Sequence, residues 1–223
     1  MIYRAAELTV SPMLRAIFRP EASGLEFVPR RGGVIIAANH ISACDEVFTP
    51  MCARRQVYYF AKAEYFTGTG LRGRAVASVF YALGQVPVDR RDPRAAAATL
   101  DIGAELLAGG KALGIYPEGT RSPDGRLHKF RTGVARLALR SGVPVVPVGL
   151  VGTDKVLPSG QRRWRRAPVS VRFGPPLDFS GRAHDERSAR VLREVSETIR
   201  EAVQRLSGQE YVDAYGSSVK SGG

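Results

Sequence analysis

The sequence predicts an α/β domain with a largely parallel central sheet flanked by helices, and three observations support this fold class. Short apolar runs bounded by glycine, proline or charged residues recur along the chain. Segments with apolar residues at helical spacing lie between these runs. The chain has 223 residues, 44% of them hydrophobic, which is enough for one core without disulfide or metal staples. Strands that alternate with helices are typical of layered domains with a parallel sheet.

The clearest strand runs from Gly33 to Ala38, because this stretch is continuously apolar after its glycines and therefore suits a strand buried on both faces. Asn39 and His40 follow it directly, so their polar side chains are expected at its carboxyl end. Further apolar runs have the length and the boundaries of strands. The full set of expected strands is 33–38, 56–61, 85–88, 112–116, 143–150 and 169–173.

Four segments have the spacing and the end signals of helices. Residues 5–18 form a short amphipathic run that ends before Pro20. The other three are expected at 92–108, 133–141 and 185–206, where a capping residue or proline precedes the helix or a glycine follows it. We therefore expect an N-terminal amphipathic helix in residues 1–22, one folded domain in residues 23–207 and a flexible tail in residues 208–223.

The charge balance favours an anionic partner. Lys and Arg number 33 against 21 Asp and Glu, which gives a formal net charge of +12. Such a charge attracts nucleic acid, an anionic lipid surface or a phosphorylated substrate, and it does not choose among them. The most apolar window, residues 143–151, contains two prolines and is shorter than the roughly 20 apolar residues of a membrane-spanning helix. Membrane contact is therefore expected to be peripheral.

The cysteines and the first residues favour a reduced cytosolic compartment. Cys44 and Cys52 match neither a redox spacing nor a zinc-ligand spacing. Glu7 stands where a secretory signal would have its apolar stretch. No export is expected from this pattern.

A first candidate for chemistry follows the strand at 33–38. His40 lies at the strand end, and Asp45 comes five residues later. Ligands bind beyond the carboxyl ends of strands in open α/β sheets, so this is a favoured place for a site. A carboxylate can orient an imidazole and stabilise its protonated form while the imidazole removes a proton from a hydroxyl. Alternatively, Asp45 caps the next helix and His40 is an ordinary loop residue.

A second candidate is the block from Tyr116 to Ser122, which also follows an expected strand. Gly119 allows close backbone approach, Thr120 offers a hydroxyl, and Arg121 offers a planar fork that suits phosphate. A proline-glycine turn with exposed charges explains the same residues without a function. Residues 129–133 then open a helix whose N-terminus could hold another anion or a carbonyl oxygen.

Two basic segments complete the candidates. Arg90 follows the strand expected at 85–88 and could hold a phosphate, or it could form a solvated ion pair with Asp89. The run 162–166 has four arginines around Trp164 and could bind nucleic acid or lipid headgroups. A charged loop of this kind is also often only solvated.

These blocks, taken together and in this order, resemble those of the glycerolipid acyltransferase family, most closely the bacterial 1-acylglycerol-3-phosphate (lysophosphatidic acid) acyltransferases. The NHxSxxD block is met by Asn39, His40, Ser42 and Asp45, the second block by 84–90, the PEGTRS block by 117–122 and the proline-rich apolar fourth block by 143–148. Residues 130–133 are similar to the segment that follows the third block in this family.

The resemblance implies a glycerol-3-phosphate acyltransferase-like fold, with residues 23–207 as the acyltransferase domain. It implies acyl-CoA or acyl carrier protein as the donor substrate, with no resident cofactor and no metal. His40 and Asp45 would be catalytic. The substrate-binding residues would be Arg90, Glu118, Gly119, Thr120 and Arg121.

The activity implied is transfer of a fatty acyl group to the free hydroxyl of 1-acylglycerol-3-phosphate, which gives phosphatidic acid in phospholipid biosynthesis. Another lysolipid, glycerol-3-phosphate or a glycolipid remains open as the acceptor. A basic module that binds membranes or nucleic acid without catalysis would explain the charge but not the blocks at the strand ends. We therefore expect a peripheral enzyme at the cytoplasmic face of the cell membrane, with an anionic lipid surface and no nucleic acid as its partner.

Overall fold

A computed structural model describes residues 2–88 and 95–220 of the chain. In this part of the chain, seven strands form one sheet in the order β1-β8-β7-β2-β5-β3-β4. Neighbouring strands run parallel except β7 and β8, which run antiparallel. The strands are β1 (Glu21–Ser23), β2 (Val34–Ala38), β3 (Val57–Lys62), β4 (Gln85–Val88), β5 (Ala112–Ile115), β7 (Val145–Val151) and β8 (Ser170–Phe173). The expected fold class is confirmed.

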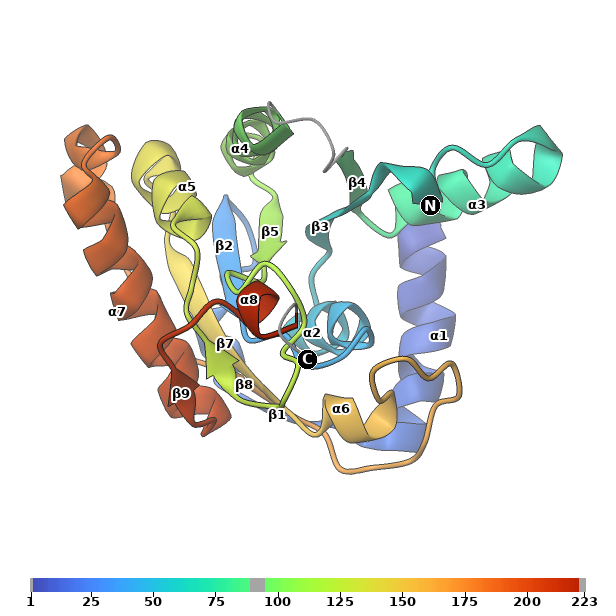
Figure 1. Cartoon of the computed structure of the whole chain (residues 1–223). Helices are drawn as coiled ribbons and strands as arrows, with labels where there is room; N and C mark the ends of the chain where they lie inside the picture. Colours follow the sequence, from blue (N-terminus) through green and yellow to red (C-terminus); the bar gives the residue numbers. More distant parts are fainter. Residues whose placement is uncertain (1, 89–94, 221–223) are drawn as a thin grey trace.

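Helices cover both faces of the sheet (Figure 1). α4, α5 and α7 lie over one face, whereas α2 lies over the other face with α1 beyond it. The helices are α1 (Ile2–Phe18), α2 (Asp45–Ala53), α3 (Gly70–Ala82), α4 (Ala95–Ala108), α5 (Gly133–Ser141), α6 (Thr153–Val156), α7 (Ala189–Ser207) and α8 (Gly216–Lys220). The first residues of the helix expected at 92–108 lie outside the described residues.

The position of β2 at the centre of the sheet explains its continuous apolar sequence. Val34 and Ile36 belong to the core between the sheet and α2, and Ile35 and Ala37 belong to the core below α5 and α7. Because successive side chains of a strand point to opposite faces, a strand covered on both sides needs apolar residues at every position. The chain therefore leaves β2 at a fully buried point, which is where the candidate site begins.

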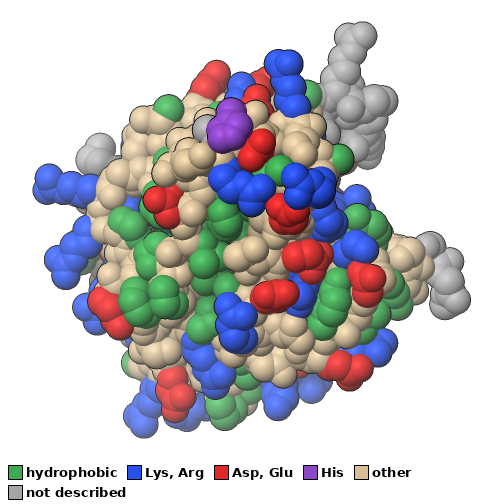
Figure 2. All heavy atoms as spheres, turned by 90° about the vertical axis from the view of Figure 1, so that its left-hand side faces the viewer, with side chains coloured by type: hydrophobic (Ala, Val, Ile, Leu, Met, Phe, Trp, Pro, Cys, Tyr) green, Lys and Arg blue, Asp and Glu red, His purple; other side chains and the backbone are tan. Residues whose placement is uncertain are grey.

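Ion pairs on the outer surface of α7 compensate part of the formal charge. Arg190 pairs with Glu194 at 2.8 Å, and Arg193 pairs with Glu197 at 3.1 Å. On this side of the molecule acidic and basic side chains are interspersed (Figure 2). Exposed pairs of this kind contribute little stability each. Because of these pairs, neither positive nor negative charge dominates the electrostatic potential of this face.

The tail expected to be flexible from residue 208 is folded as far as Lys220, and this corrects the expectation from the sequence. β9 (Tyr211–Val212) pairs in parallel with β6 (Leu127–His128) in a second, two-stranded sheet. The short helix α8 follows. The sequence of this segment contains glycine and serine and shows no periodicity. Its hydrogen-bond partners come from a loop that is distant in the sequence, so no local pattern indicates that the segment folds. Residues 221–223 lie outside the described residues.

Candidate active site

The end of β2 is held in place by Asn39. Its side-chain amide donates to the Leu150 carbonyl oxygen at 2.9 Å, and the Leu150 N–H donates to its oxygen at 2.7 Å. The same amide group donates to Gln209 Oε1 at 2.9 Å. Asn39 therefore joins β2 to β7 and to the residues that follow α7. This fixes the backbone from which His40 extends.

The structure brings His40 and Asp45 together as the spacing predicted. His40 Nδ1 lies 2.9 Å from Asp45 Oδ2. The same carboxylate oxygen accepts the backbone N–H groups of Ile41 and Ser42, each at 2.9 Å. Its other oxygen accepts the Thr153 hydroxyl at 2.5 Å. Because the carboxylate accepts, the proton of a neutral imidazole is on Nδ1, and Nε2 has a free lone pair.

Asp45 is fully buried, and all four of its hydrogen bonds are directed to the His40 turn or to Thr153. Asp45 is the first residue of α2, and its carboxylate turns back to the preceding loop instead of capping the helix. The capping alternative from the sequence therefore does not describe its geometry. Four hydrogen bonds hold the carboxylate in one orientation, and through it they hold the His40 ring.

The orientation of the His40 ring is also set by stacking. Its ring centroid lies 3.9 Å from that of Tyr116, with 12° between the planes. Tyr116 stacks in turn on Tyr59 at 5.5 Å. The Tyr59 ring crosses directly over Gly114 of β5, where a Cβ would lie only 2.1 Å from it. Glycine at this position therefore makes the ring stack possible.

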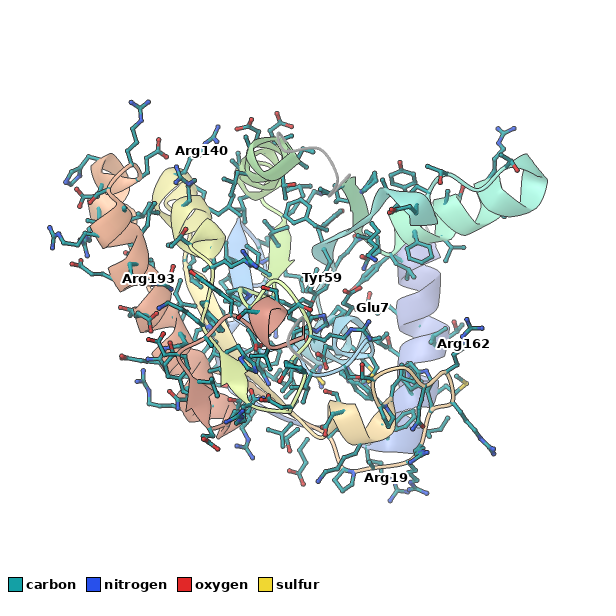
Figure 3. The ribbon with its side chains drawn as sticks, viewed as in Figure 1. Glu7, Arg19, Tyr59, Arg140, Arg162 and Arg193 are labelled. Atoms are coloured by element: carbon teal, nitrogen blue, oxygen red, sulfur yellow. The ribbon has the colours of Figure 1, made fainter. Side chains whose placement is uncertain are left out.

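A cavity of ≈ 520 Å³ lies beside His40. This volume is within the range of small-molecule sites, which is about 300–1,000 Å³. One part of its wall is aromatic and aliphatic, with Tyr59, Phe60, Phe80 and Ile115. Another part is polar, with Glu46, Lys62, Gln85, Thr120 and Arg121. The site can thus take a ligand that has both an apolar chain and a charged head. Figure 3 shows Tyr59 between the sheet and α2, at the centre of the molecule.

The structure places the predicted substrate-binding residues in different positions. Gly119, Thr120 and Arg121 line the cavity. Glu118 instead is fully buried, and its two oxygens accept the backbone N–H groups of His40 at 3.0 Å and His128 at 3.1 Å. Burial raises the pKa of Glu118 to about 7. Its carboxyl group therefore supports the His40 backbone from behind and does not reach the cavity surface.

The fifth predicted substrate-binding residue, Arg90, lies outside the described residues. The strand before it ends at Val88, whose register partner on β3 is Lys62. Lys62 lines the cavity. The chain therefore leaves β4 at the cavity end of the sheet.

Sequence reasoning missed Thr153, Tyr116 and His128 as parts of the site. Thr153 is 108 residues from Asp45 in the chain, so no local spacing could have connected the two. Tyr116 begins the second candidate block, but nothing in its sequence context indicates that its ring stacks on His40 and Tyr59. Ser42, part of the first block, donates to the Leu157 carbonyl oxygen at 2.7 Å and so holds the loop.

The fold and the site define an α/β domain with a hydrogen-bonded histidine–aspartate pair beside a cavity at the carboxyl ends of its parallel strands. A family model described as Acyltransferase matches residues 19–151, which contain His40, Asp45, the cavity-lining residues 119–121 and β7. The chain belongs to this Acyltransferase family.

Named relatives agree with this assignment. A chloroplastic 1-acyl-sn-glycerol-3-phosphate acyltransferase of Brassica napus is 33% identical over 70% of this chain and 44% of its own length. A 1-acyl-sn-glycerol-3-phosphate acyltransferase of Borreliella burgdorferi is 33% identical over 59% of this chain and 51% of its own length. The chain thus spans about half the length of these curated relatives.

A solved structure has the same fold. The 1-acyl-sn-glycerophosphate (LPA) acyltransferase PlsC from Thermotoga maritima matches with a TM-score of 0.63 and 23% identity, over 93% of this chain and 83% of that one. At this level of identity, the likeness supports the architecture of sheet and helices described above.

Proposed function

We propose that this protein transfers a fatty acyl group from an acyl thioester to the free hydroxyl of 1-acylglycerol-3-phosphate, giving phosphatidic acid. The observation that carries the proposal is the His40 and Asp45 pair, 2.9 Å apart, at a cavity with an aromatic wall and a rim that includes Arg121. The names of the relatives support this choice of acceptor.

In the proposed reaction His40 acts as the general base. Its Nε2 takes the proton of the acceptor hydroxyl while the hydroxyl oxygen attacks the thioester carbonyl carbon. A C–O bond forms, the C–S bond of the donor then breaks, and the leaving thiolate takes the proton back from the imidazolium. Asp45 stabilises the imidazolium between these steps. The acyl group passes directly from donor to acceptor without an acyl-enzyme.

The polar and the apolar lining residues of the cavity suit different parts of the substrates. Arg121 is exposed at the rim, and its planar fork matches a phosphate with two parallel hydrogen bonds. Arg90 is proposed to bind the same phosphate, and Gly119 and Thr120 to contact the acceptor nearby. The aromatic wall formed by residues 59 and 60 suits the acyl chain.

We also propose that the protein works peripherally at an anionic surface on the cytoplasmic face of the membrane. None of the helices in the described ranges is long and apolar enough to cross a bilayer. α1 exposes four apolar side chains, namely Leu8, Val10, Met13 and Ile17. Apolar side chains on one helix, next to cations, are typical of helices that lie in the headgroup region.

The basic loop 162–166 lies at the base of α1. Trp164 contacts Phe18 of α1, with ring centroids 5.6 Å apart. The four arginines of the loop are exposed, and none forms an ion pair with another described residue. Figure 3 shows Arg162 and Arg19 beside this end of α1, both pointing outward. Uncompensated cations beside exposed apolar residues are complementary to anionic lipid.

A panel of acceptors with one labelled long-chain acyl-CoA tests the proposed activity, and a parallel series uses acyl carrier protein as the donor. We expect thiol release and labelled phosphatidic acid with 1-acylglycerol-3-phosphate, and loss of both in His40→Ala with an unchanged melting temperature. If a glycolipid, another lysolipid or glycerol-3-phosphate were acylated faster than 1-acylglycerol-3-phosphate, the proposed acceptor would be wrong. The proposed acyl-transfer mechanism would still apply. Near-normal turnover by His40→Ala would overturn the mechanism.

A further inference from the structure

The segment that follows α7 lies across the loop that carries the candidate substrate-binding residues. Gln209 Nε2 donates to the Gly125 carbonyl oxygen at 2.6 Å, and the Leu127 N–H donates to the Glu210 carbonyl oxygen at 2.9 Å. The Lys129 N–H donates to the Ala214 carbonyl oxygen at 3.0 Å. Figure 1 shows α8 surrounded by the loop that follows β5. We refer to residues 209–220 as the C-terminal strap.

The strap makes contact where the loop meets the cavity. Gly216 is buried, and a Cβ there would lie 3.3 Å from Thr120 Cγ2 and 3.5 Å from His128 Cγ. Thr120 lines the cavity. The strap therefore lies directly behind the rim formed by Gly119, Thr120 and Arg121.

Arg131 joins the strap to this rim. Its side chain lies against Gly119, where φ is +73° and a Cβ would be 2.8 Å from Arg131 Nε. Its guanidinium carbon is 5.2 Å from the centre of the Tyr215 ring, and its Nη2 donates to Ser217 Oγ at 3.1 Å. The guanidinium is thus held beside a cavity-lining residue from two sides.

The partners of Arg131 are neutral, which leaves its charge available. An aromatic face and a hydroxyl orient a guanidinium without neutralising it. Arg126, by contrast, pairs with Asp124 at 2.7 Å on the same loop. Within the described ranges, no carboxylate pairs with Arg131. A fixed, uncompensated guanidinium is preorganised for a phosphate or carboxylate.

We propose that Arg131 is a further guanidinium for the acceptor phosphate, in addition to Arg121 and Arg90, and that Tyr215 and Ser217 of the strap are the residues that position it. This inference rests on the proposed function, because it assigns Arg131 to the acceptor of that reaction. Arg121 and Arg131 then approach the phosphomonoester from the two sides of Gly119. The strap acts on acceptor binding through Arg131 and takes no part in the acyl transfer itself.

Kinetics of the full-length protein separate this role from a merely structural one. We expect Arg131→Gln, and the double variant Tyr215→Ala with Ser217→Ala, to raise the acceptor KM roughly tenfold, the loss of one charge-assisted contact. The donor KM and kcat should stay within about twofold of wild type. Tyr215→Phe and Ser217→Thr keep the ring and the hydroxyl and should restore the wild-type acceptor KM.

The matched controls are Asp213→Asn, which breaks another strap contact at Lys129, and Val219→Ala on the exposed side of α8. Both should keep the wild-type acceptor KM. An unchanged acceptor KM in Arg131→Gln, or equal rises for donor and acceptor, would overturn the inference. If the double variant does not fold, as judged by its melting curve, Arg131→Gln decides alone.

Binding without turnover distinguishes failure of the inference from failure of the proposed function. Titration calorimetry compares 1-acylglycerol-3-phosphate with 1-acylglycerol, which lacks the phosphate, in the same detergent. We expect wild type to prefer the phosphorylated lipid and Arg131→Gln to lose most of that preference. A preference retained by Arg131→Gln refutes the role of Arg131 alone. No preference in wild type refutes both the inference and the proposed acceptor.

Discussion

Replacement of Asp45 by asparagine tests the proposed mechanism most directly, because it removes a charge and leaves the shape of the site. An asparagine oxygen in place of Oδ2 can accept from His40 and from the N–H groups of Ile41 and Ser42. Its amide then faces Thr153, whose hydroxyl can rotate to accept. We therefore expect Asp45→Asn to fold. What the variant loses is the negative charge beside the imidazolium.

The size of that loss follows from the 2.9 Å contact between His40 Nδ1 and Asp45 Oδ2. Opposite unit charges about 4 Å apart attract by about 4 kcal/mol at an effective dielectric constant of 20. Since about 1.4 kcal/mol corresponds to tenfold in rate, kcat should fall about 10³-fold. This is within the range of about 10²- to 10⁴-fold for general acid–base catalysis. The KM values should change little, because neither substrate touches Asp45 in the proposed reaction.

The assay is thiol release from acyl-CoA in the presence of saturating acceptor, with thermal unfolding as the measure of folding. Thr153→Val is the matched control, because it removes a hydrogen bond from the same carboxylate and keeps its charge. We expect Thr153→Val to lose about 1–3 kcal/mol of stability and less than tenfold in kcat. If both variants lowered kcat equally, or if Asp45→Asn kept kcat within tenfold of wild type, the charge would not be the source of catalysis.

Three further predictions concern pH, phosphate and membrane. Burial raises the pKa of Glu118 to about 7, above its ordinary value of 4.5, so its contribution to stability is fully present below pH 4.5 and is lost as the pH rises through 7. The Glu118→Gln side chain stays neutral at all pH values. Between pH 5 and 8, the free energy of unfolding of this variant, measured in urea, should therefore fall by roughly 3 kcal/mol less than that of wild type. Arg121→Lys and Arg90→Lys should raise the acceptor KM more than the donor KM, because lysine lacks the planar fork. The protein should sediment with anionic vesicles, less so as salt rises, and little with neutral ones, and replacing Arg162 and Arg163 by glutamine should weaken this binding.

Each of these predictions has an outcome that contradicts it. Parallel stability curves for Glu118→Gln and wild type would mean that this carboxyl group does not take up a proton on folding. Equal KM changes for donor and acceptor in Arg121→Lys would remove its phosphate role. Equal sedimentation with neutral and anionic vesicles at all salt concentrations would remove the electrostatic account and leave apolar insertion of α1. Arg140→Gln, far from the basic loop in Figure 3, removes one positive charge and serves as the control for the single variant Arg162→Gln in the vesicle assay.

The parts of the fold that sequence predicted are those that local pattern determines. β2 was predicted because burial on both faces requires an uninterrupted apolar run. The end of α7 was predicted because a glycine, Gly208, directly follows the helical pattern. Gly208 takes a left-handed conformation, with φ at 72°, that other residues adopt at a cost. The proximity of His40 and Asp45 was predicted because five residues of one turn are enough to bring them together.

The parts that sequence did not predict depend on distant contacts. The three-residue strand β1 is too short to show a pattern, and the antiparallel direction of β8 depends on its pairing with β7. The inward position of Glu118 depends on N–H groups of His40 and His128, on two separate segments. Spacing alone would place its carboxyl group at the cavity with its neighbours.

The hydrogen bonds of Asn39 to Leu150 and Gln209 have a consequence for the folding of the chain during its synthesis. The hydrogen bonds around the turn from Asn39 to Asp45 are complete only when Leu150, Thr153 and Gln209 have been added, and Gln209 lies 170 residues after Asn39. A nascent chain that has not reached Gln209 contains His40 and Asp45 but lacks the Gln209 contact that helps to fix the turn carrying them. This turn therefore reaches its final geometry only after a segment 170 residues further along the chain has been synthesised.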